Sequence, residues 1–242
     1  MSRPGSFAGH LAWCSTVVDG RPACYGTAGV GLPVLFLHGW ALGHHTYKRA
    51  LKRLVQMGCQ VIAPALPGFS GTANLPEDDV NFPAYADWVA QFLQRLGCEE
   101  PVMVIGHSFG GAVAVQLAAD HPRAVRQLVL VNSIGGATWR YHGQRILLMT
   151  ERPLWDWGLR FPTDLWPITK AAWVASFVRD DLLRNVVLNP QGTWRAAMLA
   201  RGADLADELE RIRLSGLPVL ALSGRDDQVV PRASFEALCE AL

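Results

Sequence analysis

The chain has 242 residues, half of them hydrophobic, and a formal net charge of +1. This length and composition predict a single globular enzyme-sized unit with a large core. The near-neutral charge argues against nucleic acid or an anionic membrane as a partner, because it provides no long-range field that would attract either. No signal-peptide run occurs at the start and no stretch is long and apolar enough to span a bilayer, so we expect a cytoplasmic protein without an integral membrane segment.

Five cysteines are scattered along the chain, and none stands in CxxC spacing: Cys14, Cys24, Cys59, Cys98 and Cys239. This pattern predicts reduced, mostly buried thiols and argues against a disulfide or metal framework. The glycines at 29 and 31 lead into a strand and not a helix, and no Gly-Lys-Ser/Thr occurs, so neither a dinucleotide fingerprint nor a P-loop is present. We therefore expect no metal and no cofactor.

The amino-terminal part of the chain predicts a hairpin, then two buried strands separated by a helix. Residues 12–18 and 21–26 flank Asp19-Gly20, a dipeptide that suits a two-residue hairpin turn. Continuous apolar runs at 34–37 and 61–64 are typical of strands buried on both faces. The residues between these runs recur at helical spacing up to a glycine stop: Tyr47, Leu51, Leu54, Val55 and Gly58.

The same alternation continues along the chain. Apolar residues within 82–96 lie on one helical face, and Gly97 ends this second helix. Apolar runs at 102–105, 128–131 and 219–222 predict three more strands. The order strand, helix, strand implies an α/β fold with a mostly parallel sheet and helices on both faces.

The stretch between Gly135 and Leu217 departs from this order. It has no good strand, and its prolines divide helical segments such as 145–149 and 193–199 into short pieces. Six of the nine tryptophans lie in it: Trp139, Trp155, Trp157, Trp166, Trp173 and Trp194. We interpret residues 135–215 as an inserted helical cap, and residues 1–134 with 216–242 as the core. Most of the tryptophans should pack the cap onto the core, and a few should line an apolar substrate pocket.

Ser108 stands in the most informative motif of the chain. The apolar run at 102–105 leads into Gly106-His107-Ser108-Phe109-Gly110, and a helix-like segment follows. The two glycines of this Gly-x-Ser-x-Gly pattern allow a tight strand-to-helix turn, which holds the serine strained at its tip with the hydroxyl outward. The motif predicts a nucleophile; an incidental serine in a glycine-rich turn is the alternative.

The turn His38-Gly39-Trp40 directly follows the predicted strand at 34–37. A glycine there lets backbone amides approach a bound carbonyl, so the Trp40 N–H can donate one half of an oxyanion hole and the Phe109 N–H the other half. We interpret His38 as a histidine held by backbone hydrogen bonds and not as a base. His44 and His45 are adjacent and cannot share a helical face as metal ligands would, so we expect them at the surface or the pocket rim.

A candidate acid follows the predicted strand at 219–222. Asp226 and Asp227 lie where a carboxylate at the carboxyl end of a strand could orient a base toward Ser108. No histidine occurs after His142. His107 is not a suitable base, because the residue before the nucleophile should turn away from the substrate side, and His142 lies in the presumed cap.

Together these motifs resemble the α/β-hydrolase family in its cap-bearing branch, over essentially the whole chain. The resemblance rests on residues 38–40, 106–111 and 224–231, with a further similar loop at 65–72. It implies the α/β-hydrolase fold, Asp227 as the acid beside a solvated Asp226, and a base histidine roughly 25 to 30 residues beyond the acid. We therefore expect this chain to be truncated before its catalytic histidine; a degraded relative that cannot turn over is the alternative.

The expected activity is that of a serine hydrolase that cleaves an ester or related acyl bond of an apolar small molecule through an acyl-enzyme. Within the resemblance, a serine at this position argues against haloalkane dehalogenases and epoxide hydrolases, which use an aspartate there. Acyl transfer, carbon–carbon bond hydrolysis and cofactor-free perhydrolysis stay open, because all of them can use the same triad. A non-catalytic ligand-binding relative is the alternative from another class. The sequence does not indicate the oligomeric state.

Overall fold

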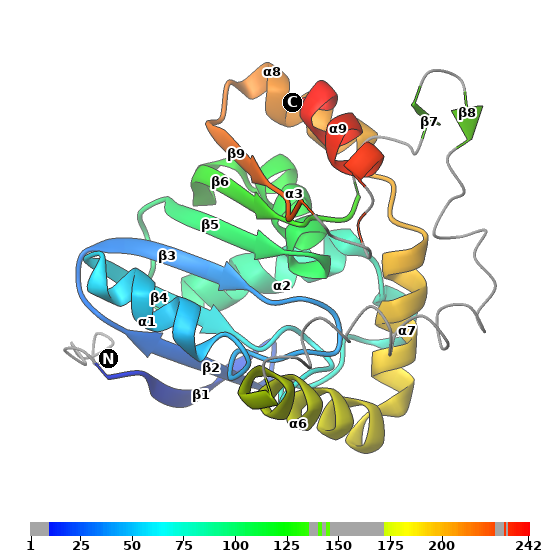
Figure 1. Cartoon of the computed structure of the whole chain (residues 1–242). Coiled ribbons are helices and arrows are strands. Elements are labelled where there is room, and N and C mark those ends of the chain that lie inside the picture. Colours follow the sequence, from blue (N-terminus) through cyan, green and yellow to red (C-terminus); the bar gives the residue numbers. More distant parts are fainter. Residues whose placement is uncertain (1–9, 136–139, 142–143, 146–171, 226–229, 231) are drawn as a thin grey trace.

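A seven-stranded sheet forms the centre of the protein (Figure 1). The computed structural model describes residues 10–135, 140–141, 144–145, 172–225, 230 and 232–242. The strand order is β1-β2-β4-β3-β5-β6-β9. The five strands from β4 to β9 in this order run parallel to one another: β3 (Leu32–Leu37), β4 (Cys59–Pro64), β5 (Val102–His107), β6 (Val125–Val131) and β9 (Val219–Leu222). The predicted mostly parallel sheet is therefore confirmed.

The predicted hairpin forms the antiparallel edge of this sheet. Strands β1 (Ala12–Val18) and β2 (Arg21–Ala28) pair antiparallel, and β2 continues antiparallel onto β4. Asp19 and Gly20 both have positive φ, at 48° and 71°. This is the backbone that a two-residue hairpin turn needs, and it is why an Asp-Gly dipeptide predicted the turn correctly.

Helices cover both faces of the sheet, and β3 shows the two faces directly. Leu35 and Leu37 belong to the larger hydrophobic cluster, whereas Phe36 belongs to a smaller one that packs with Leu51 of α1. Because successive side chains of a strand point to opposite faces, the two clusters lie on opposite sides of the sheet. The helices outside the stretch predicted to be a cap are α1 (Lys48–Gln56), α2 (Phe82–Arg95), α3 (Phe109–Asp120) and α9 (Arg232–Ala241), whereas α8 (Ala206–Ser215) lies within that stretch. Two short 3₁₀ turns, η1 (Glu77–Asp79) and η2 (Pro122–Ala124), join elements of the core.

The stretch between Gly135 and Leu217 contains α6 (Ala172–Leu188) and α7 (Pro190–Arg201), which lie beside the carboxyl ends of the parallel strands (Figure 1). The expected helix at 193–199 is confirmed within α7. The expectation of no strand was wrong in part, because β7 (Arg140–Tyr141) and β8 (Gln144–Arg145) form a short antiparallel pair. Such two-residue strands are too short to leave a period-2 pattern in the sequence. The expected helix at 145–149 begins in β8 and otherwise lies outside the described residues. The division into core and cap stays a prediction.

All five cysteines carry free thiols. The expectation that they are mostly buried was wrong, since four are half-buried and Cys239 is exposed. Cys14, for example, lies on the outermost strand, whose residues are alternately covered and open. Within the part of the chain that the structure describes, no helix is long and apolar enough to cross a membrane.

Candidate active site

Ser108 occupies a one-residue turn between β5, which ends at His107, and α3, which begins at Phe109. Its backbone has φ 52° and ψ −114°, a conformation that residues other than glycine rarely adopt and that costs on the order of 1–3 kcal/mol. The Ser108 N–H donates to the carbonyl of Val131 on the neighbouring strand β6, at 3.0 Å. The strained strand-to-helix turn predicted from the sequence is therefore confirmed.

The glycines around Ser108 are required by close backbone packing. A Cβ atom on Gly106 would lie 2.5 Å from the carbonyl oxygen of Gly110. A Cβ atom on Gly110 would lie 2.6 Å from the carbonyl oxygen of His38. Real Cβ atoms do not approach backbone this closely. Gly106 therefore allows the end of β5 to pack directly against α3, and Gly110 allows the start of α3 to pack directly against the end of β3. The nucleophile turn and the loop that carries Trp40 are consequently neighbours.

His38 is a structural residue at the base of this loop. Its ring is fully buried, Nδ1 lies 2.9 Å from the Gly39 carbonyl, and Nε2 accepts a hydrogen bond from the Leu66 N–H at 2.9 Å. These partners assign the neutral tautomer with the proton on Nδ1. Burial lowers the pKa of His38 to about 4, so the ring stays neutral at physiological pH. The interpretation of His38 as a backbone-bonded histidine is confirmed.

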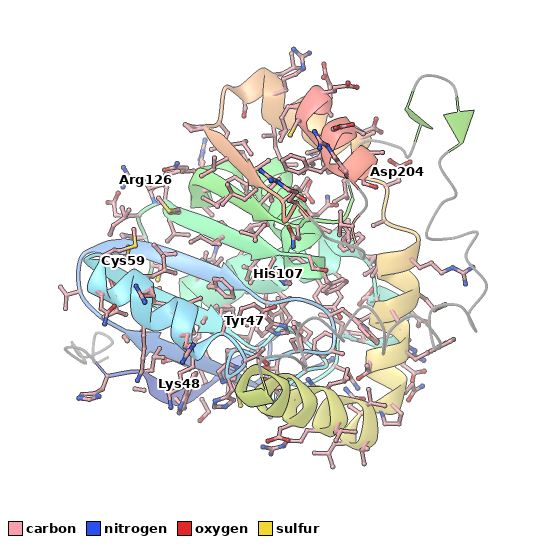
Figure 2. The ribbon with its side chains drawn as sticks, in the orientation of Figure 1. Tyr47, Lys48, Cys59, His107, Arg126 and Asp204 are labelled. Carbon is pink, nitrogen blue, oxygen red and sulfur yellow. The ribbon has the colours of Figure 1, made fainter. Side chains whose placement is uncertain are left out.

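Tyr47 joins the loop after β3 to the end of β5. Its hydroxyl accepts the Gly39 N–H at 3.1 Å and lies 2.8 Å from Nδ1 of His107 (Figure 2). Burial raises the pKa of Tyr47 well above its usual value, so the hydroxyl keeps its proton and can donate it to His107. The sequence placed Tyr47 only as an apolar helical position. The feature of the sequence that could have indicated more is the tyrosine hydroxyl, because a buried hydroxyl needs a hydrogen-bond partner.

Trp40 is held on both its backbone and its side chain. Leu42 N–H donates to the Gly39 carbonyl at 3.2 Å, which closes a tight turn around Trp40 and Ala41, and Ala41 has a positive φ of 55°. The indole Nε1–H of Trp40 donates to the carbonyl of Thr193 on α7, at 2.9 Å. The candidate oxyanion donor thus sits in a strained turn that α7 contacts directly.

His44 was expected at the surface or the pocket rim, and the surface position was wrong. His44 is 2% exposed, and its Nδ1 atom has no hydrogen-bond partner among the described residues. Its ring centre lies 5.0 Å from that of Trp13 on β1 and 4.3 Å from that of His45. Burial lowers the pKa of His44 to about 3. The ring of Trp13, a residue distant in sequence, packs against His44, and the local sequence does not indicate this contact. His45 is exposed as expected.

The candidate acids Asp226 and Asp227, like His142, lie outside the described residues, so their roles stay predictions. The start of the acid-bearing segment is described. Asn132, which follows β6, accepts the Gly224 N–H at 2.8 Å, and its own N–H donates to the Leu222 carbonyl. Because β5, β6 and β9 are consecutive parallel strands, Gly224 leaves the sheet at the same end as Ser108, with one strand between them. Phe109, the second candidate oxyanion donor, begins α3 with its ring fully buried.

A groove of about 1060 Å³ lies at the other end of the sheet. It is lined by residues at the amino ends of the parallel strands, among them Pro33, Gln60 and Val102. Ser108 follows the carboxyl end of β5, so this groove is remote from the candidate site. Within the described ranges, no group of three His, Cys, Asp or Glu side chains is placed to hold a metal ion.

Comparison with known proteins agrees with this geometry. The profile of the alpha/beta hydrolase fold family matches residues 33–242. The AB hydrolase superfamily protein YisY of Bacillus subtilis is 29% identical over 223 residues, covering 84% of this chain and 77% of that protein. A pimeloyl-(acyl-carrier protein) methyl ester esterase of Aromatoleum aromaticum is 30% identical over 228 residues, covering 86% and 85%. The crystal structure of an enol-lactonase from Burkholderia xenovorans superposes with a TM-score of 0.75 at 17% identity, covering 94% of this chain and 87% of that one, a likeness of fold alone.

Proposed function

The chain belongs to the α/β-hydrolase family, and we propose that it acts as a serine hydrolase that cleaves an ester or related acyl bond of an apolar small molecule. The observation that carries the proposal is Ser108, held at φ 52° between β5 and α3 as the nucleophile of this architecture should be. The similar methyl ester esterase supports an ester as the bond that is cleaved.

In the proposed reaction, the Ser108 hydroxyl oxygen attacks the carbonyl carbon of the substrate and its proton passes to a base. The N–H groups of Trp40 and Phe109 stabilise the oxyanion that forms on the carbonyl oxygen. Collapse of this intermediate releases the alcohol, which takes the proton, and leaves an acyl-serine. Water then attacks the acyl-serine by the same route and restores the enzyme. Asp227 is the proposed acid that orients the base.

The proposed base is a histidine on a segment that follows residue 242 in a longer form of the chain. The described histidines next to the site have other partners: His38 bonds to backbone and His107 to Tyr47. His121 lies at the surface, 2.7 Å from a carboxylate oxygen of Asp87. These contacts support a base that comes from elsewhere.

Residues 135–215 are the proposed cap, and contacts between α6, α7 and the loops beside Ser108 support this assignment. The indole of Trp40 donates to the Thr193 carbonyl, and Asp181 on α6 accepts hydrogen bonds from the N–H and hydroxyl of Thr46. Helices held this close to the loop after β3 can enclose an apolar acyl group over Ser108.

The test is hydrolysis of p-nitrophenyl butyrate by the 242-residue chain and by a form extended to include the next downstream histidine. Each length is made with and without Ser108→Ala, and Ser15→Ala, an exposed serine on β1, serves as the control. The extended chain should turn over and lose this with Ser108→Ala. The 242-residue chain should keep only the roughly 10³ to 10⁴-fold acceleration over water that binding and an oxyanion hole supply.

Two outcomes would contradict the proposal. Turnover that Ser108→Ala leaves unchanged would exclude Ser108 as the nucleophile. Full, Ser108-dependent turnover by the 242-residue chain would show that one of its own histidines is the base. Labelling by a fluorophosphonate, which reacts with activated serines, gives a second readout of the same comparison.

A further inference from the structure

Two polar side chains on one face of α6, and a third at the N-cap of α7, bond to the loops beside Ser108. Asp181 and Asn185 stand four residues apart on α6, so they lie one above the other on the same side of that helix. Asn189 directly follows α6 and is the N-cap residue of α7. Asp181 accepts from Thr46 in the loop after β3. Asn189 donates to the Gly68 carbonyl in the loop after β4. Asn185, between them, contacts both loops.

The side-chain amide of Asn185 is buried and bonded at both ends. Its Nδ2 donates to the carbonyl oxygens of Ala41, at 2.9 Å, and Leu42, at 3.3 Å. Its Oδ1 accepts the Ser70 N–H at 2.8 Å. Carbonyl partners require the NH₂ group and an N–H partner requires the oxygen, so the orientation of the amide follows from its contacts. Asparagine is the short side chain that can donate to one loop and accept from the other.

Both loops reach Asn185 through a residue in the left-handed region. Ala41 has a φ of 55° and Ser70 a φ of 46°. A residue other than glycine stays in this conformation only when its surroundings hold it there. At Ala41, the surroundings include the amide of Asn185, which bonds to the carbonyl of that same residue.

Ala41 immediately follows Trp40, and Asn185 also reaches Trp40 by a second route. The hydroxyl of Thr193 donates to the main-chain carbonyl of Asn185 at 2.9 Å, and the carbonyl of Thr193 accepts the indole N–H of Trp40, also at 2.9 Å. Together with the peptide bond between Trp40 and Ala41, these hydrogen bonds form a closed ring of contacts that runs from Asn185 through Ala41, Trp40 and Thr193 back to Asn185. In this ring of contacts, the bond to Ala41 holds the backbone next to Trp40, and the bond to Thr193 holds the indole ring.

We propose that Asn185 is a positioning residue for the oxyanion hole, because its amide holds Ala41 in the left-handed conformation that aims the Trp40 N–H. This rests on the proposed function, in which that N–H receives the oxyanion. Asn185 itself touches no reacting atom. Its effect should fall on the transition state, where the oxyanion exists, and not on the binding of the ester.

The test compares Asn185→Asp with Asn189→Asp in the form of the chain that shows Ser108-dependent ester turnover. Both substitutions make the same chemical change, one on α6 and the other at the N-cap of α7. Each keeps an acceptor for its N–H partner and replaces a donated bond with a carboxylate facing a carbonyl. Only Asn185 contacts the loop of Trp40. Thermal unfolding midpoints are measured for both variants, so that a difference in kcat between them can be separated from a difference in stability.

Asn185→Asp should lower kcat for p-nitrophenyl butyrate about 10 to 100-fold with KM within about 3-fold of the parent, less than the 10² to 10³-fold cost of deleting a donor outright. Asn189→Asp should lower the midpoint comparably and leave kcat within about 3-fold. A kcat within 3-fold in Asn185→Asp, or equal losses in both variants, overturns the proposal. An absence of Ser108-dependent turnover in the parent is a failure of the proposed function and is seen before any Asn185 variant is made.

A milder variant covers the case in which Asn185→Asp does not fold. Thr193→Val keeps the shape of the side chain and removes only the hydroxyl bond to the Asn185 carbonyl. It should lower kcat more than 3-fold with KM unchanged. An unchanged kcat in Thr193→Val, together with an unfolded Asn185→Asp, would show that Asn185 supports the fold and not the oxyanion hole.

Discussion

The hydroxyl of Tyr47 and the imidazole of His107, 60 residues apart in the chain, are joined by a 2.8 Å hydrogen bond directly before the nucleophile position. The same hydroxyl accepts the Gly39 N–H, so one side chain connects the two segments that carry Ser108 and Trp40 (Figure 2). The relative position of Ser108, the proposed nucleophile, and Trp40, the proposed oxyanion donor, thus depends on a residue that belongs to neither motif.

Tyr47→Phe should reduce both stability and turnover. It leaves the buried Gly39 N–H without its acceptor, which costs about 1–3 kcal/mol in the free energy of unfolding. It also frees the loop of Trp40 to shift against Ser108, so kcat should fall at least about 10-fold. Denaturant unfolding and ester kinetics measure the two effects.

Tyr85→Phe is the matched control. Tyr85 is also buried, and its hydroxyl donates to the Pro67 carbonyl at 3.1 Å, away from Gly39 and His107. This control should lose stability with kcat nearly unchanged. Equal kcat losses in the two variants would show that general destabilisation, and not the Gly39 contact, explains the effect of Tyr47→Phe.

Gly110→Ala should prevent folding of the site. The new methyl group would lie 2.5 Å from the carbonyl carbon of Leu37 and 2.6 Å from the carbonyl oxygen of His38, and neither backbone atom can move without displacing β3. We expect a loss of more than about 3 kcal/mol in stability or no soluble protein. Gly202→Ala, where a methyl group would meet carbonyl oxygens only at 3.7 and 3.9 Å, should be tolerated. A stable, folded Gly110→Ala would mean that the elbow is less tightly packed against β3 than described.

The features that could be predicted from the sequence are those that depend on residues close together in the chain. The hairpin turn at Asp19-Gly20 and the elbow at Ser108 were predictable, because a local backbone requirement selects particular residues at adjacent positions. The mostly parallel sheet with helices on both faces followed from the alternation of strands and helices. Local pattern also assigned His38 correctly, since a histidine ending a buried strand has backbone groups close at hand.

The parts that could not be predicted depend on residues distant in sequence. Asn185 meets Ala41 from 144 positions away, and nothing around Asn185 in the sequence indicates that contact. His44 was expected at the surface or the pocket rim, and the contact that buries it comes from Trp13, which lies much earlier in the chain on β1. Tyr47 fits a helical apolar pattern while its function in the fold comes from its hydroxyl. Such contacts form only once the sheet brings its loops together.

Ser108→Gly should make the protein more stable and inactive. Serine at φ 52° and ψ −114° is strained, whereas glycine adopts positive φ without a Cβ penalty, so relief of about 1 kcal/mol should outweigh the higher entropy of the unfolded glycine chain. Ser108→Ala keeps the Cβ and should stay near the parent in stability while losing the same activity. Unfolding in urea measures the difference, and a Ser108→Gly variant less stable than Ser108→Ala would show that the serine backbone is not strained.

Acid should destabilise the protein through its two buried histidines. Burial lowers the pKa of His38 to about 4 and of His44 to about 3, from an ordinary value of 6.5. Below pH 6.5 the unfolded chain therefore binds protons at these sites that the folded protein does not, and stability falls as the pH falls toward 4 and then 3. Each histidine should remove about 2 kcal/mol between pH 7.5 and 5. His44→Leu should eliminate its share, so that the variant loses about half as much as the parent from these two sites over the same window. Urea unfolding at both pH values measures this, and identical losses in parent and variant would mean that His44 is protonated in the folded protein.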